Sequence, residues 1–267
     1  MKKVISFSSG KGGVGKTSLV ASLGFLWAKQ GKKVLIVDGD WSLGKMGLTL
    51  GIKPQWAIHD VLEGKVDLRE AIQGVNSHLS LLASPSGVMG FEELSENHRN
   101  QLYYEIDALQ EFYDLILIDH SSGVHWGVIQ FAAAAHQHVI LTTAEPTSYM
   151  DAYAIMKILS QRFKVRNFQL IVTMSQQISE TKKIIDRFID ISQSHLDVKV
   201  LEVGHFLFEP KLAEALRLQK PFASLYPDIA FTQQLSGVCK TLERIPCDKG
   251  NGLKFFYSEN TNPMIAR

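Results

Sequence analysis

A glycine-rich loop between a short apolar run and an amphipathic segment constrains this chain more than any other feature. The stretch GKGGVGKT satisfies the pattern G-x-x-x-x-G-K-[ST] at Gly10, Gly15, Lys16 and Thr17. Residues 3–8 before it are typical of a strand, and residues 17–29 after it carry apolar side chains at helical spacing. A strand, such a loop and a helix in that order are typical of a phosphate-binding loop. The chain is therefore expected to bind the phosphates of a nucleotide.

Each residue type in the loop has a chemical reason. Glycines let backbone N–H groups turn toward phosphate oxygens, and the positive end of the following helix adds to the attraction. Lys16 is expected to reach the β- and γ-phosphates, and the Thr17 hydroxyl is a hard ligand for Mg²⁺. The nucleotide contacts expected from the loop are Gly10, Lys11, Gly12, Gly13, Val14, Gly15, Lys16, Thr17 and Ser18.

Three acids follow two apolar runs further along the chain. Asp38 and Asp40 end VLIVDGD, and Asp119 ends LILID. In an open parallel sheet, ligands gather at the carboxyl ends of the strands. We expect Asp119 to be the main acid on the Mg²⁺ side, with Asp38 beside it, and Asp40 to orient the attacking water. A strand-end aspartate also caps helices or forms turns, and the upstream loop favours the site interpretation.

The remaining chain alternates short apolar runs with helical patterns, which predicts an α/β fold. Such runs are typical of a mostly parallel, twisted sheet covered by helices on both faces. No linker or repeat divides the sequence, so we predict one P-loop NTPase domain over residues 1–246 and a tail over 247–267. The expected strands are residues 3–8, 33–38, 79–83, 114–119, 138–143, 168–173 and 198–203. The expected helices are residues 17–29, 58–63, 97–111, 126–135, 148–162, 180–194 and 228–245.

Composition excludes several classes of protein. The 267 residues carry a net charge of +1, which makes DNA an unlikely partner for the surface as a whole. Cys239 and Cys247 fit neither a disulfide framework nor a metal-site spacing, so a cytoplasmic location is expected. Residues 121–144 lack Asp, Glu, Lys and Arg, but histidines and glutamines interrupt them, and buried core is the better interpretation. We assign no transition metal to the nine histidines.

Three motifs together resemble a known family. KGGVGKT, with Lys11 directly before the glycines, resembles the deviant Walker A motif of the MinD/ParA ATPases. Residues 38–40 resemble the first switch of that family, and residues 119–123, ending at Gly123, resemble the second. Less specific segments resemble the FlhG/FleN branch of this family, which regulates flagellar number. They include residues 41–72 and the stretches TTAEPTSYMDAYAIMKIL and EPKLAEALRLQKPF.

The resemblance implies an ATP-dependent homodimer that hydrolyses ATP slowly with Mg²⁺. Lys11 would act from the opposite subunit, Lys16 would hold the phosphates in its own subunit, and Asp40 would complete the catalytic set. The implied switch residues are Asp38, Asp40, Asp119 and Gly123, and the implied metal set is Thr17, Asp38 and Asp119. Thr173, Glu209 and Pro210 match positions that contact the nucleotide on its adenine side.

The sequence also departs from the family at several positions. Leu43, Gly44 and Lys45 stand where L-x-N is usual, and Gly47 stands where an acid is expected. The strand-end asparagine that often reads adenine appears as Thr173. The sequence begins almost at its first strand, without the segment through which many FlhG proteins stimulate the GTPase FlhF, so action on FlhF stays an open question at this point.

Three functions remain open at this point. The first is an ATP-switched dimer that controls flagellar number or placement through flagellar assembly or regulatory proteins. The second is a positioning ATPase for division or another polar structure, and the third is an ATP-binding module with little turnover. The tail carries Leu253, Phe256 and Tyr257. A tail that packs on its own domain or is disordered is favoured over contact with the inner face of the cell membrane.

Overall fold

The centre of the fold is an eight-stranded sheet with the strand order β3-β4-β2-β5-β1-β6-β7-β8. This computed structural model describes residues 2–41, 44–84 and 95–247. The strands are β1 (Lys3–Ser9), β2 (Val34–Gly39), β3 (Ile72–Gly74), β4 (Leu79–Leu82), β5 (Leu115–Ser122), β6 (Gln137–Thr143), β7 (Asn167–Ser175) and β8 (Lys199–Leu207). All neighbouring pairs are parallel except β3 with β4. The carboxyl ends of the parallel strands therefore meet at one edge of the sheet.

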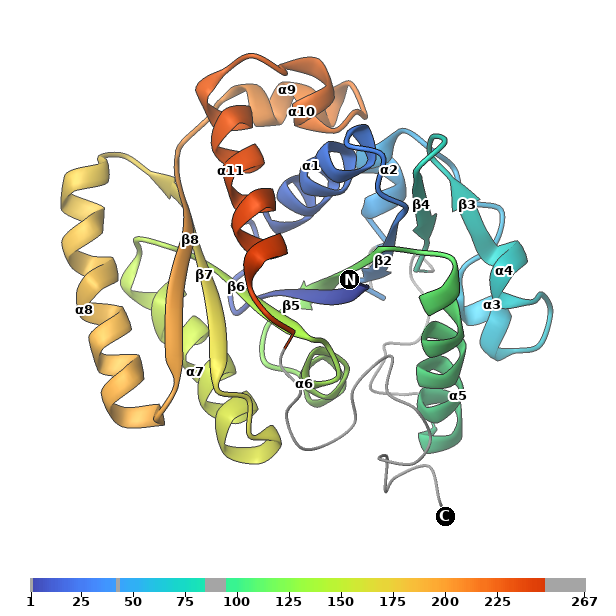
Figure 1. Ribbon diagram of the computed structural model, residues 1–267, viewed down its shortest axis with the longest axis horizontal. Helices are drawn as coiled ribbons and strands as arrows, with labels where there is room; N and C mark the ends of the chain where they lie inside the picture. The colour runs from blue at the N-terminus through green and yellow to red at the C-terminus, as the bar shows by residue number, and fades with distance from the viewer. Residues whose placement is uncertain (1, 42–43, 85–94, 248–267) are drawn as a thin grey trace.

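Helices cover both faces of this sheet (Figure 1). The longer ones are α1 (Lys16–Lys29), α5 (Glu96–Asp107), α6 (Trp126–Ala133), α7 (Pro146–Phe163), α8 (Ile178–Leu196) and α11 (Ala230–Arg244). The shorter ones are α2 (Met46–Leu50), α3 (Ile58–Leu62), α4 (Leu68–Ala71), η2 (Ala108–Glu111), α9 (Lys211–Arg217) and α10 (Phe222–Leu225). One buried cluster joins α1 and α11 to the first face, and two others join α3, α5, α6, α7 and α8 to the second. Among the helices in the described ranges, none has the length and apolar character needed to cross a bilayer.

The mostly parallel α/β fold predicted from the sequence is confirmed, with three local differences. β5 continues past Asp119 because Asp119 and His120 pair in register with Asp38 and Gly39 of β2. The segment expected as one helix over residues 97–111 forms α5 and then a 3₁₀ turn. The sequence did not predict β3, α2, α4, α9 or α10, because these elements have seven residues or fewer and show little periodicity.

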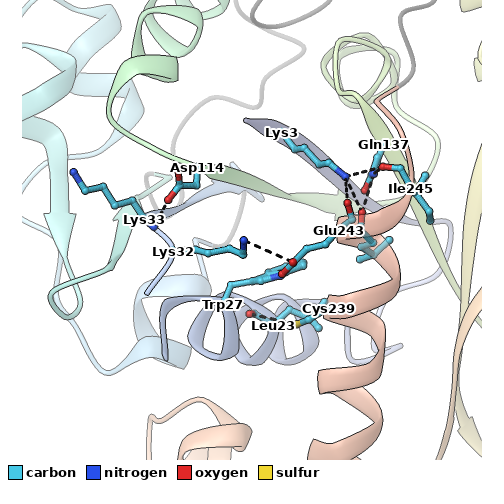
Figure 2. A network of polar contacts seen from close by, with 11 residues as sticks. Lys3, Leu23, Trp27, Lys32, Lys33, Asp114, Gln137, Cys239, Glu243 and Ile245 are labelled. Carbon is cyan, nitrogen blue, oxygen red and sulfur yellow. Dashed lines mark hydrogen bonds and ion pairs between the residues drawn. The ribbon is translucent and has the colours of Figure 1, made fainter. Parts of the chain in front are cut away.

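The C-terminal end of α11 is tied to the sheet by two buried side chains. Lys3 Nζ on β1 donates to the carbonyl oxygens of Leu242, Glu243 and Ile245 at 3.0, 2.7 and 2.6 Å. Gln137 Nε2 on β6 donates to two of the same oxygens, and Figure 2 shows both side chains pointing at the helix end. The last carbonyls of a helix have no partner within it, so these donors satisfy them, and the Lys3 ammonium also adds positive charge at the negative end of the helix dipole.

Replacing Lys3 with methionine is expected to destabilise the fold by about 1–3 kcal/mol, because buried carbonyl oxygens lose their donor. Lys3 is only 3% exposed, and burial lowers the pKa of its ammonium group. Equilibrium unfolding in urea measures the change, and Lys2→Met at the exposed neighbouring lysine is the matched control. A Lys3→Met protein as stable as the control would show that Gln137 alone is sufficient.

Candidate functional site

The phosphate-binding loop lies between β1 and α1, as the sequence predicted. Gly15 is the N-cap of α1 with φ +83°, a conformation that favours glycine. Among the described residues, no side chain caps this helix, so its first N–H groups remain available to an anion. Gly10 lies against α7, where an added Cβ would come within 2.2 Å of Asp151 Cβ. A larger residue at position 10 would therefore push the loop away from α7.

Lys16, Thr17 and Asp119 form one buried cluster at this edge of the sheet. Lys16 Nζ lies 2.7 Å from Asp119 Oδ1 and also donates to the carbonyl oxygen of His120. The Thr17 hydroxyl donates to Asp119 Oδ2 at 2.7 Å. Lys16 and Asp119 are both almost fully buried, so each charge depends on the other for compensation. The structure thus brings together the three residues expected to hold phosphate and metal.

Asp38 anchors the loop that follows β2. Its carboxylate accepts hydrogen bonds from the backbone N–H groups of Asp40 at 3.0 Å and Met46 at 3.1 Å. The side chain is buried opposite Asp119, its register partner on β5. Burial and, next, the negative charge of Asp119 raise the pKa of Asp38 to about 7. Asp38 therefore both holds the loop after β2 and adds a carboxylate next to Asp119.

His120, in the segment that resembles the second switch, packs inside the protein. Its ring packs edge-on against Phe131 of α6 at a centroid distance of 5.9 Å. Burial, together with the nearby Lys16 ammonium, lowers the pKa of His120 to about 3. The ring is therefore neutral at physiological pH and adds no positive charge beside the loop.

Lys11 lies outside the pocket of its own chain. Its ammonium group pairs with the carboxylate of Glu145, the N-cap residue of α7. Both side chains are well exposed, at 43% and 60%. An exposed ion pair of this kind contributes only about 0–1 kcal/mol, so Lys11 can exchange its partner at little cost. The sequence analysis missed Glu145, although it lies two residues after β6 and precedes a proline at the start of a helix.

A pocket of about 540 Å³ opens beside the loop. Every residue from Gly12 to Ser18 lines it, and so do Asp40, Lys45, Thr173, Glu209 and Pro210, which the sequence had singled out. The sequence analysis missed the residues that line the rest of it: Ser9, Leu19, Leu48, Thr49, Ser122, Met174, Leu207, Phe208, Leu212, Ala213, Leu216 and Phe231. Most of these residues belong to no local motif. They line the pocket because β7, β8, α2 and α9 converge there.

The structure places two of the residues that differ from the family pattern after residues 38–40. Lys45 lines the pocket, and its carbonyl accepts hydrogen bonds from the N–H and hydroxyl of Thr49. An added Cβ at Gly47 would come within 3.1 Å of Pro54 and 3.2 Å of the Ile52 carbonyl. The acid expected at position 47 would therefore need its neighbours to move. Leu43 and the tail residues 248–267 lie outside the described residues.

The oxygen atoms at this edge fit a magnesium ion. Thr17 Oγ1 and both oxygens of Asp119 lie together, and Asp38 is the next carboxylate across the β2–β5 pair. Magnesium takes one or two carboxylates, keeps several waters and binds substrate phosphates, so this small set is sufficient. The raised pKa of Asp38 also fits a metal site, because a divalent cation would relieve the repulsion between the carboxylates of Asp38 and Asp119. When bound, Mg²⁺ supplies charge neutralisation at the β- and γ-phosphates.

Asp38 should make the stability of the metal-free protein depend on pH. Its folded pKa of about 7 lies above the ordinary aspartate pKa of 3.8, so the native state binds more protons than the unfolded state between these values. The stability contribution of Asp38 therefore falls as pH rises through that window. We expect Asp38→Asn to gain on the order of 2 kcal/mol relative to wild type between about pH 5 and about pH 8.

Urea unfolding in metal-free buffer at both pH values measures this relative change. Asp190→Asn on the exposed face of α8 is the matched control and should show no such trend. If Asp38→Asn followed wild type at both pH values, the carboxyl of Asp38 would already be ionised in the folded protein.

Comparison with known proteins agrees with this geometry. A family model described as an AAA domain matches residues 2–172. The chain is 31% identical to the putative septum site-determining protein MinD of Oltmannsiellopsis viridis, over 82% of this chain and 70% of that protein. The chain belongs to the MinD/ParA family of P-loop ATPases. In this MinD/ParA-family chain, the buried cluster of Lys16, Asp119 and Thr17 lies where β1, β5 and the start of α1 meet.

Two further relatives match nearly the whole chain. The antiactivator FleN of Pseudomonas aeruginosa is 25% identical over 95% of this MinD/ParA-family chain and 91% of its own length. The flagellum site-determining protein YlxH of Helicobacter pylori is 27% identical, with coverages of 90% and 81%. Among solved structures, the Aquifex aeolicus MinC:MinD cell division complex superposes with a TM-score of 0.73 at 27% identity, covering 93% of this chain and 99% of that one. The resemblance to the FlhG/FleN branch is therefore supported over most of the chain.

Proposed function

We propose that this protein is a slow ATPase that dimerises when it binds ATP and Mg²⁺, and that it controls the number or placement of flagella. The observation that carries the dimer is the position of Lys11. Its ammonium group lies on Glu145 outside the pocket, while Lys16 already occupies the phosphate side. Lys11 is therefore available to complete the site of a second subunit.

The proposed switch rests on the loop after β2. Asp40 and Lys45 line the pocket, and Asp38 accepts hydrogen bonds from the backbone N–H groups of Asp40 and Met46. A γ-phosphate in the pocket would order this loop, and its hydrolysis would release the loop. ATP bound across two subunits stabilises the dimer by linkage, and loss of the γ-phosphate weakens it. The same dimer state would present a surface to protein partners in the cytoplasm.

The flagellar role rests on the names of the two relatives, FleN and YlxH. The MinD relatives and the cell division complex favour a second candidate, a positioning ATPase for division or another polar structure. The near-neutral charge of the chain speaks against a DNA-segregation role. A tail contact with the inner face of the membrane remains a separate proposal, tested by co-sedimentation with vesicles of anionic lipid with and without residues 248–267.

The decisive experiment measures mass and turnover together. Light scattering after gel filtration should give a dimer with Mg²⁺ and ATP and a monomer with ADP, and phosphate release should accompany the dimer. A monomer under both conditions would overturn the switch. A dimer without phosphate release would favour an ATP-binding module with little turnover. In cells that lack the gene, flagella counted by electron microscopy should change in number or position, whereas displaced septa alone would favour the second candidate.

A further inference from the structure

β7 carries a bulge where it reaches the pocket. Val172 of β7 pairs with His205 of β8, and Ser175 pairs with Leu207. β7 therefore has one residue more than β8 between these two pairs. Within this stretch Met174 has φ +58°, a left-handed conformation that is strained for a bulky side chain. Bulges and strained residues of this kind are common beside functional sites, where the surrounding structure must hold them in place.

The bulge forms part of one wall of the pocket. Thr173 and Met174 both line the pocket, and the Met174 methyl carbon lies 3.9 Å from the position that a Cβ on Gly15 would take. The residue before Met174 is anchored, because the Thr173 hydroxyl donates to the carbonyl oxygen of Val14 at 2.8 Å. The position of Met174 against the phosphate-binding loop therefore depends on how the bulge is held on its other side.

Ser175 and His205 hold that other side. Ser175 Oγ and His205 Nε2 share a hydrogen bond of 2.8 Å. The carbonyl oxygen of Ser175 also accepts the N–H of Phe208 at 2.9 Å. Ser175 is only 1% exposed, and a buried hydroxyl without a partner is costly. Among the described residues that line the pocket, neither Ser175 nor His205 is present, so any effect of theirs on a ligand must pass through the bulge.

Two charged side chains orient the His205 ring. Its Nδ1 faces Glu202 Oε1 at 3.6 Å, and Glu202 Oε2 accepts a hydrogen bond from Lys182 Nζ of α8 at 2.6 Å. Burial lowers the pKa of His205, so the ring is neutral at physiological pH. A carboxylate only accepts, so Glu202 favours the proton on Nδ1 and leaves Nε2 to accept from the Ser175 hydroxyl. Because α8 packs beside the edge strand β8 (Figure 1), these contacts run from the surface of the protein to the pocket wall.

We propose that His205 and Ser175 are positioning residues for the nucleotide: their hydrogen bond fixes the bulge at Met174, and with it the pocket wall next to the phosphate-binding loop. The inference rests on the proposed nucleotide site. Without this bond Met174 would relax from its left-handed conformation, and the wall would lose the shape that receives the ligand. Nucleotide affinity should then fall, because binding would have to restore the strained conformation.

Isothermal titration calorimetry with ADP in Mg²⁺ buffer measures this effect without hydrolysis or ATP-dependent dimerisation. His205→Ala and Ser175→Ala should each raise the ADP dissociation constant by about fivefold or more, with the stoichiometry unchanged. Because both remove the same bond, the double variant should raise the constant little further than either single variant. Partial unfolding would instead lower the stoichiometry at an unchanged dissociation constant, which would contradict a positioning role.

His205→Gln is the conservative variant, because its amide oxygen can accept the Ser175 proton. It should keep the ADP dissociation constant within about twofold of wild type. His195→Ala, at an exposed histidine of α8, is the matched control. A dissociation constant for His205→Ala equal to that of the control would overturn the inference and leave the proposed ATPase standing. Folded wild-type protein that binds no ADP would overturn the proposed function itself.

Met174→Gly tests the route through the bulge. Glycine adopts φ +58° without strain, so the bulge no longer needs the His205 bond in this background. Whatever the affinity of Met174→Gly itself, adding His205→Ala should change the ADP dissociation constant by less than about twofold. An effect as large as that in the wild-type background would overturn the inference, because His205 would then reach the nucleotide by a route other than the bulge.

Discussion

Replacing Lys11 with alanine is expected to lower ATP hydrolysis by about 10³-fold or more while ATP still binds, which is the size of effect seen when a catalytic cation is supplied in trans. Transfer of a phosphoryl group spreads negative charge over its equatorial oxygens, and an added cation stabilises that charge. Lys16 remains in place in this variant, because it is held by Asp119 and the His120 carbonyl. The Lys11→Ala variant should therefore keep ATP binding and lose ATP hydrolysis.

The same variant should also fail to dimerise with ATP. Phosphate release, light scattering and calorimetric binding of ATP measure the three properties on one preparation. Lys157→Ala, which removes an exposed lysine further along α7, is the matched control and should behave as wild type. Normal turnover by Lys11→Ala would show that the lysine is only a solvated partner of Glu145.

A mixing experiment tests whether Lys11 acts in trans. Lys11→Ala retains Asp40, and an Asp40→Ala subunit retains Lys11, so a mixed dimer contains one site with both residues intact. If Lys11 serves the opposite subunit, that complete site forms on the Lys11→Ala chain, and mixing should restore part of the activity. No recovery in a mixture shown to contain mixed dimers would contradict action in trans.

Replacing Asp40 with alanine is expected to lower turnover by about 10²–10⁴-fold, the usual range for a group that orients or activates the attacking water. Asp40 lines the pocket, and its backbone N–H is fixed on Asp38. Because that contact uses the backbone, alanine keeps it, and the loop should retain its path. The variant should therefore bind ATP and stay dimeric, trapped before hydrolysis.

Single-turnover phosphate release and light scattering measure these two outcomes for Asp40→Ala. Asp190→Ala on the exposed face of α8 controls for the loss of one acid from the protein. Asp40→Asn should resemble the alanine variant if the negative charge is required, and should keep activity if the side chain acts only through hydrogen bonding. An alanine variant that hydrolyses normally would remove Asp40 from the mechanism.

Much of the site was predictable because its parts lie at positions set by local rules. The loop from Gly10 to Thr17 is one contiguous motif, and strand–loop–helix geometry follows from its neighbours. Asp38 and Asp119 each end an apolar run, and parallel strands bring their carboxyl ends to one edge. The sheet and its helices were predictable because short apolar runs alternate with helical patterns along the chain.

The sequence by itself determined the parallel α/β fold, the phosphate-binding loop and the acids at its edge, because short-range patterns specify each of them. Only the tertiary structure decided how those residues use their polar atoms. It directs the Thr173 hydroxyl to Val14, places the Lys11 ammonium on Glu145, and uses both carboxylate oxygens of Asp38 to hold a loop. These partners come from separate elements, and which atoms meet depends on packing between them, which no local spacing encodes.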